Sequence, residues 1–86
     1  MKLVTQNFKV GAIYCDVPND LPLKTYLMFI KVDLNTATTY FKYVGGCNCY
    51  NSSDDGLCEL KYPTKMFELS NSEIKDLVSK DIIKFN

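Results

Sequence analysis

Four cysteines are the residues whose type and spacing could carry chemistry in this chain of 86 residues. Three of them form the pattern Cys47-x-Cys49-x8-Cys58, and Cys15 lies far upstream. Four thiolates can hold Zn²⁺ at Zn–S distances of about 2.3 Å, and a bound metal would stabilise a small core. Structural zinc sites favour cysteines with a longer spacing than that of Cys47 and Cys49. The spacing therefore favours free thiols and no cofactor, and a module stabilised by zinc on all four cysteines remains the alternative.

A disulfide between Cys49 and Cys58 is a third interpretation, because the two residues flank a turn. Residues 1–7 become polar before the hydrophobic region of a signal peptide could form, so we expect a cytoplasmic protein in which disulfides are disfavoured.

The longest strongly apolar run, residues 26–30, is far too short to span a membrane. Residues 51–55 carry oxygen-bearing side chains of the kind that bind Ca²⁺, but their spacing is not that of a calcium-binding loop. This segment is therefore predicted to be a solvated turn.

The absence of histidine and arginine removes whole classes of functional site. Without histidine there is no Ser-His-Asp or Cys-His nucleophile, and without arginine there is no bidentate guanidinium for phosphate or guanine. Lysine supplies all ten basic residues against ten Asp and Glu, so the formal net charge is zero. Zero net charge removes the long-range attraction behind most nucleic-acid binding. We therefore expect no enzyme, and a small-barrel nucleic-acid binder with stacked tyrosines is a disfavoured alternative.

Tyrosines give the positive indication of a binding surface. A domain this small cannot bury all six of its tyrosines, and tyrosine is enriched in protein interfaces. The predicted partner-binding residues are Tyr40, Tyr43, Tyr50 and Tyr62. The competing interpretation is that these side chains only pack at the edge of the hydrophobic core and bind no partner.

The sequence thus predicts a small non-catalytic protein-binding module. The lysine-only basic complement and the many asparagines are typical of A/T-rich coding DNA, which favours a phage or mobile-element origin. The expected partner is then a host protein, which the module inhibits or redirects. No membrane partner is expected.

Alternating apolar residues predict strands over residues 8–15, 25–34, 38–44 and 58–62, the last resuming over 65–69. The second and third of these should pair as an antiparallel hairpin, and the glycine pair at 45–46 should end it. One apolar face of the central strand is predicted to comprise Tyr26, Met28, Ile30, Val32 and Leu34.

A capping box, Ser70-Asn71-Ser72-Glu73, predicts one short helix over residues 70–79. A terminal strand is expected over residues 81–85. This element order predicts a single domain over residues 1–86, of α+β class with mainly antiparallel strands. The first choice is a small, partly open barrel that resembles SH3-type barrels in element order, and the alternative is a single sheet with one helix. The predicted core is Val10, Ile13, Met28, Ile30, Val32, Phe41, Leu60, Phe67, Ile74, Leu77 and Ile82.

Overall fold

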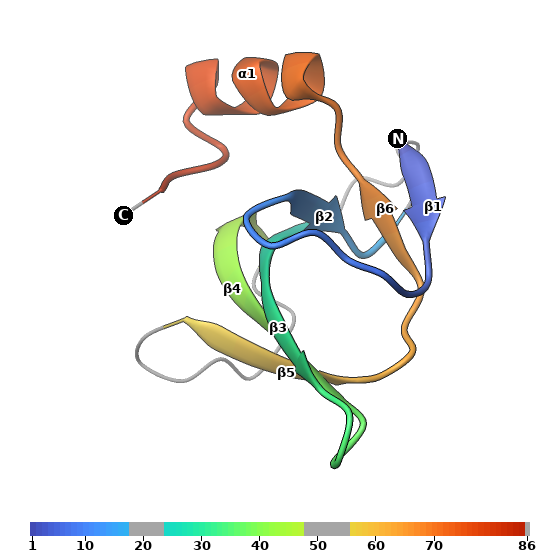
Figure 1. Cartoon of the computed structure of the whole chain (residues 1–86). Helices are drawn as coiled ribbons and strands as arrows, with labels where there is room; N and C mark the ends of the chain where they lie inside the picture. Colours follow the sequence, from blue (N-terminus) through green and yellow to red (C-terminus); the bar gives the residue numbers. More distant parts are fainter. Residues whose placement is uncertain (18–23, 48–55, 86) are drawn as a thin grey trace.

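A computed structural model describes residues 1–17, 24–47 and 56–85 of the chain (Figure 1). Its elements are β1 (Lys2–Val4), β2 (Ile13–Cys15), β3 (Thr25–Asp33), β4 (Thr38–Gly46), β5 (Leu57–Lys61), β6 (Met66–Glu68) and α1 (Asn71–Ser79). The six strands form one antiparallel sheet in the order β1-β6-β2-β3-β4-β5. The α+β class with mainly antiparallel strands is confirmed. The sheet curves without closing into a barrel, so the single sheet with one helix is the architecture that describes it.

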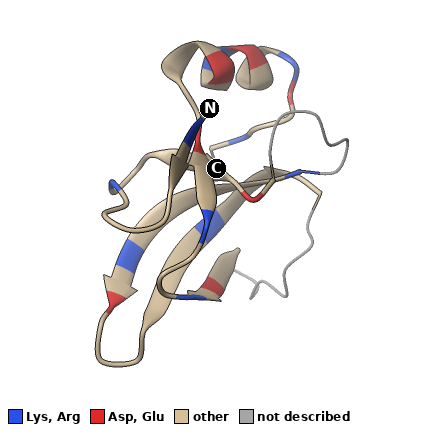
Figure 2. Cartoon of the chain, turned by 90° about the vertical axis from the view of Figure 1, so that its right-hand side faces the viewer, with Lys and Arg blue, Asp and Glu red and all other residues tan. Residues whose placement is uncertain are grey.

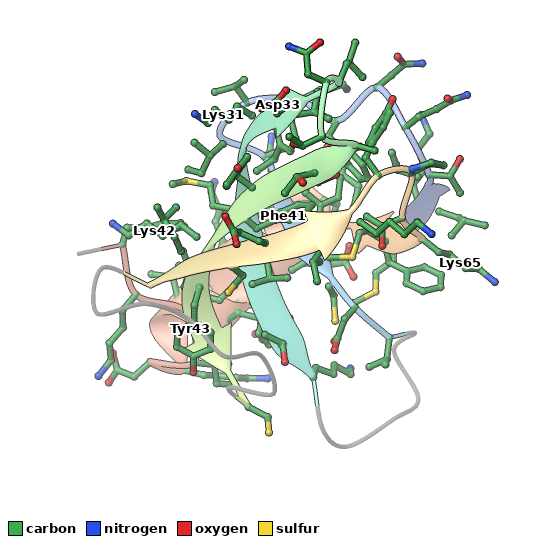
Figure 3. The ribbon with its side chains drawn as sticks, turned by 90° about the horizontal axis from the view of Figure 1, so that it is seen from below. Lys31, Asp33, Phe41, Lys42, Tyr43 and Lys65 are labelled. Carbon is green, nitrogen blue, oxygen red and sulfur yellow. The ribbon has the colours of Figure 1, made fainter. Side chains whose placement is uncertain are left out.

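Two hydrophobic cores form on opposite faces of this sheet, because successive side chains of a strand alternate in direction. The inner core, on the side toward which the sheet curves (Figure 1), comprises Tyr14, Leu27, Phe29, Phe41, Cys58 and Met66. Phe41 of this core is labelled in Figure 3. The helix-side core comprises Ile13, Cys15, Tyr26, Val44, Leu69 and Ile83. Ile74 and Leu77 of α1 pack against the helix-side core, so the helix covers part of the outer face of the sheet.

The predicted β3–β4 hairpin is confirmed, but the two strands pair through two irregularities. The ladder runs from Phe29↔Phe41 directly to Lys31↔Tyr40, which leaves Ile30 as an extra residue in β3. A bulge of this kind changes the face of every later residue. The prediction of one shared face is therefore wrong, because Tyr26 and Met28 belong to the helix-side core whereas Val32 packs against the inner core.

Several predicted boundaries also move. Gly45 and Gly46 do not end the strand, since β4 continues through both. The strand predicted over residues 8–15 is shortened to β2, and the terminal strand over 81–85 is reduced to one bridge between Gly45 and Ile83. The strands predicted over 58–62 and 65–69 are confirmed as β5 and β6. The sequence reasoning missed β1, a strand of three residues at the edge of the sheet.

Of the predicted core residues, Ile13 and Phe41 are confirmed as buried. Two others are wrong: Val10 is 79% exposed, and Ile82 is 38% exposed while the next residue, Ile83, fills the helix-side core. The remaining predicted core residues are half-buried: Met28, Ile30, Val32, Leu60, Phe67, Ile74 and Leu77. Of these, Met28, Ile74 and Leu77 pack against the helix-side core, and Val32 and Leu60 pack against the inner core.

The helix begins as the capping box predicts. The backbone N–H of Glu73 donates to Ser70 Oγ at 3.3 Å, and Ser70 N–H donates to Glu73 Oε1 at 2.8 Å. These two bonds satisfy backbone donors that the first helical turn leaves without partners. Within the described ranges, no helix has both the length and the apolar character needed to span a bilayer.

Replacing Ser70 with alanine is expected to lower the free energy of unfolding by about 1 kcal/mol, because the variant loses the cap. Urea denaturation followed by far-UV circular dichroism measures this loss. The matched control is Ser79→Ala at the other end of α1, where the hydroxyl only donates back to the Asp76 carbonyl at 2.7 Å and the effect should be smaller. Equal denaturation midpoints for wild type and Ser70→Ala would contradict the capping role.

Candidate functional site

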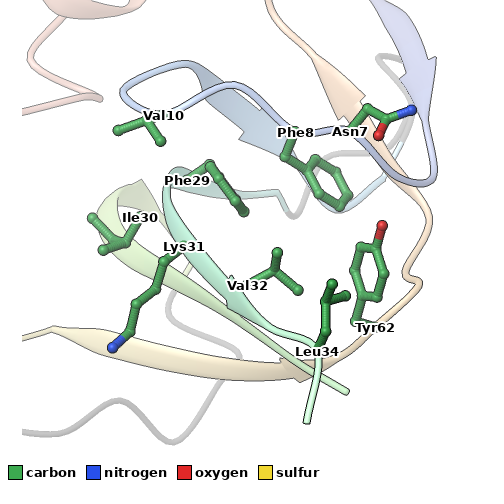
Figure 4. A pocket seen from close by; sticks show the side chains of 9 residues that line it. All are labelled: Asn7, Phe8, Val10, Phe29, Ile30, Lys31, Val32, Leu34 and Tyr62. Carbon is green, nitrogen blue, oxygen red and sulfur yellow. The ribbon is translucent and has the colours of Figure 1, made fainter. Parts of the chain in front are cut away.

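An apolar groove with a volume of about 440 Å³ opens beside β3 (Figure 4). Its lining comes from the segment before β2, from β3 and the turn that follows it, and from the residue after β5. The lining residues are Asn7, Phe8, Val10, Phe29, Ile30, Lys31, Val32, Leu34 and Tyr62. Figure 4 shows Phe8, Val32, Leu34 and Tyr62 pointing toward one common space. Residues distant in sequence therefore build one concave surface.

Phe8 anchors the groove to the inner core. Its ring lies 5.1 Å from Tyr14, 5.5 Å from Phe29 and 5.6 Å from Phe41, measured between ring centroids. These edge-to-face and stacked contacts are the favourable geometries of aromatic pairs. The backbone N–H of Lys9 also donates to the Tyr14 hydroxyl at 2.9 Å. Burial raises the pKa of Tyr14, so this hydroxyl stays protonated behind Phe8.

The rim of the groove exposes large aliphatic side chains. Val10 is 79% exposed and Leu34 is 73% exposed, the highest values among large hydrophobic residues that the structure describes. Gly11, at φ +84°, donates its N–H to the Phe29 carbonyl at 3.1 Å, and this turn holds Val10 outside the core. Leu34 follows the last residue of β3, at the start of the hairpin turn. Both positions are set by backbone geometry and not by the burial of their side chains.

Electrostatically the groove is nearly neutral, since Lys31 is the single charged residue among its described lining. The Lys31 ammonium lies 5.0 Å from the centroid of the Tyr40 ring, a cation–π distance. Figure 2 shows lysines interspersed with acidic residues over the visible face, without a region of one sign. The arrangement suits an apolar ligand better than a polyanion.

The four predicted partner-binding tyrosines do not form one surface. Tyr62 lines the groove, whereas Tyr40 pairs with Glu59 on the outer face of the sheet. Tyr43 packs against the inner core, and its hydroxyl donates to the Gly46 carbonyl. Tyr50 lies outside the described residues. Sequence reasoning missed Phe8 and Leu34 as groove residues and assigned Val10 to the core.

The cysteines are not brought together either. Cys15 lies in the helix-side core and Cys58 in the inner core, so their thiols are on opposite faces of the sheet. Cys47 is half-buried at the end of β4, and Cys49 lies outside the described residues. In the part of the chain that the structure describes, no three potential ligands form a metal-binding group. The fold therefore does not assemble the alternative zinc site of four cysteines.

Burial is the largest cause that raises the pKa of both Cys15 and Cys58, which keeps their thiols protonated and disfavours metal binding. We expect the purified protein to contain much less than an equimolar amount of zinc. A chelator should leave the melting temperature unchanged. Elemental analysis and a thermal melt with and without chelator make the measurement, and stoichiometric zinc whose removal unfolds the protein would contradict it.

The groove is thus the candidate functional site, because it combines a concave apolar surface with the two most exposed large hydrophobic residues that the structure describes. Known proteins provide no further guide. No family model, curated protein or solved structure matches this chain.

Proposed function

We propose that this chain is a small non-catalytic protein-binding module whose groove receives an apolar segment of a partner protein. The exposure of Val10 and Leu34 beside the groove is the observation that carries this proposal. Exposed aliphatic surface is unfavourable in water, and a bound apolar segment would remove that cost. Apolar surface next to a concave site is a common mark of a binding site.

The partner segment should carry two large apolar side chains. One would enter the space among Phe8, Val32 and Tyr62, and the other would lie across the exposed rim. No complementary charge is required beside them, since the ammonium of Lys31, the one charge in the described lining, lies over the Tyr40 ring and away from this space. The Tyr62 hydroxyl offers a hydrogen bond at the polar edge of the contact.

We propose further that the partner is a host protein, and that the chain is a phage or mobile-element product that inhibits or redirects it. The support is compositional: basic residues that are all lysine and seven asparagines, as A/T-rich coding produces. Binding without catalysis also agrees with a chain that has no histidine and no arginine.

A capture experiment with matched variants tests the binding function. Leu34→Asp places a charge on the rim, and Val78→Asp places the same charge on α1, where Val78 is 40% exposed and lines no part of the groove. Both variants should melt near the wild-type temperature because each changes an exposed residue. Proteins captured from a bacterial lysate by the wild type should be retained by Val78→Asp and lost with Leu34→Asp.

Three results would contradict the proposal. The first is a lysate in which no captured protein depends on Leu34. The second is equal loss of the captured protein with both variants, which would indicate a general effect of charge. The third is retention of RNA or DNA at physiological salt, which would favour the nucleic-acid alternative.

A further inference from the structure

We propose that two copies of this chain pair through their β5 strands into one continuous antiparallel sheet. Among the residues that the structure describes, β5 pairs with β4 on one side, and no strand pairs with its other edge. Figure 3 views the sheet from the side of β5 and shows this strand lying across β4. An open strand edge presents backbone N–H and C=O groups that can accept another strand. This contact involves no residue of the groove and is independent of the proposed function.

The backbone bonds at the two ends of β5 identify which residues face the open edge. Tyr43 N–H donates to the Gly56 carbonyl at 2.8 Å, and Tyr62 N–H donates to the Ala37 carbonyl at 2.7 Å. In an antiparallel ladder, the residues that bond to the neighbouring strand alternate with residues that face away. Even-numbered residues from 56 to 62 therefore bond to β4, and the N–H and C=O groups of Glu59 and Lys61 face outward.

The two outward-facing residues carry opposite charges, and both side chains are exposed. In a pairing about a two-fold axis, the register centred on Leu60 places each Glu59 opposite Lys61 of the second copy. Centring the axis on Glu59 would oppose two carboxylates, and centring it on Lys61 would oppose two ammonium groups. Opposite charges stabilise a cross-strand pair and like charges destabilise it, so the sequence of β5 selects the Leu60-centred register.

The packing on both faces agrees with this register. On the inner face, each half-buried Leu60 would contact its symmetry mate, since residues opposite each other without ladder bonds have close side chains. On the outer face, Tyr40 already lies beside Glu59, and Thr38 lies beside Lys61. The Glu59–Lys61 salt bridges between the two copies would therefore continue the rows of neighbouring side chains that run across β4 and β5. In this register only residues 59–61 of the two β5 strands face each other, so the contact buries a small area and belongs to the weak class of interfaces.

Variants that reverse the charges of Glu59 and Lys61 test both the β5–β5 contact and its register. Sedimentation velocity over a concentration series should show a concentration-dependent dimer for the wild type. Glu59→Lys and Lys61→Glu should each raise the dissociation constant about tenfold, because each converts two attractive pairs into two repulsive ones. The double variant Glu59→Lys/Lys61→Glu should recover the wild-type value. An equimolar mixture of the two single variants should form a heterodimer.

Two controls separate the edge contact from other effects. Lys65→Glu changes net charge as Lys61→Glu does, at an exposed residue outside β5, and should leave the dimer intact. Amide hydrogen exchange at Glu59 and Lys61 should slow as protein concentration rises, whereas the Leu60 amide, which faces β4, should not respond. Far-UV circular dichroism verifies that each variant is folded.

A wild-type protein that remains monomeric up to about 1 mM, equivalent to a binding free energy no better than about −4 kcal/mol, would overturn the proposal. A dimer that both single variants retain would also overturn it, as would concentration-independent exchange at Glu59 and Lys61. Because the groove variant Leu34→Asp and its control Val78→Asp both lie outside β5, loss of partner capture and loss of the dimer are distinguishable results.

Discussion

Replacing Phe41 with alanine is expected to lower the free energy of unfolding by about 3–5 kcal/mol. Phe41 is fully buried at the centre of the inner core, and its ring centroid lies 5.6 Å from Phe8, 6.0 Å from Tyr14 and 5.7 Å from Phe29. Alanine would leave a cavity and remove three aromatic contacts at once. A chain of this length has a total stability on the order of 4–13 kcal/mol, so the variant should lose a large share of it.

Urea denaturation measures this change, with Phe85→Ala as the matched control. Phe85 is 55% exposed, and its replacement should leave the denaturation midpoint close to that of the wild type. The same loss in both variants would mean that Phe41 does not occupy the centre of the inner core.

Gly45→Ala is expected to cost about 2–5 kcal/mol, comparable with truncating the buried side chain of Ile83. A methyl group at Gly45 would overlap the backbone oxygen of Ile82 and lie 3.0 Å from the Ile83 Cα atom. The segment after α1 would have to move away, which breaks the Gly45–Ile83 bridge and draws Ile83 out of the helix-side core.

A double-mutant cycle with Ile83→Ala examines this mechanism. If both changes act by releasing the same segment, the double variant should be destabilised about as much as either single variant. Gly11→Ala is the control for glycine replacement in open space, because a Cβ atom there has no neighbour within 4 Å, although φ +84° still costs about 1–2 kcal/mol. Additive losses from Gly45→Ala and Ile83→Ala would contradict a shared origin.

The parts of the fold that the sequence predicts are those encoded by neighbouring residues. Ser70 and Glu73 form the capping box at the start of α1, and the β3–β4 hairpin follows from β-branched and aromatic residues on both sides of a short turn. Local hydrogen bonding and strand propensity are sufficient for these elements.

The sequence-based predictions that are wrong concern features that depend on contacts between distant segments. Nothing in the sequence around Ile30 marks it as the extra residue of a bulge, so alternation alone assigned the later residues to the wrong face. Replacing the half-buried Ile30 should consequently cost less than replacing Phe41. Gly45 resembles a strand terminator, yet it is required by the close approach of Ile82, a residue far along the chain.

The candidate site was the least predictable part. Val10 has the pattern of a core residue in an alternating strand, but the turn at Gly11 moves it to the rim of the groove. Tyr62 lines the groove, where its place depends on β3 and the segment before β2, and its role in partner binding stays a prediction. Concave sites are made by tertiary packing, which composition and periodicity do not encode.

The pairing of β1 with β6 has a consequence for the order of folding. Lys2 lies opposite Glu68 and Val4 opposite Met66, so this ladder closes all the other strands into one long loop. The β3–β4 hairpin joins residues separated by a short turn, and its loop-closure entropy is correspondingly smaller. The hairpin should therefore form early and the β1–β6 ladder late. In reverse, β1 should detach first under mild denaturation, exposing the edge of β6 while the inner core is still intact.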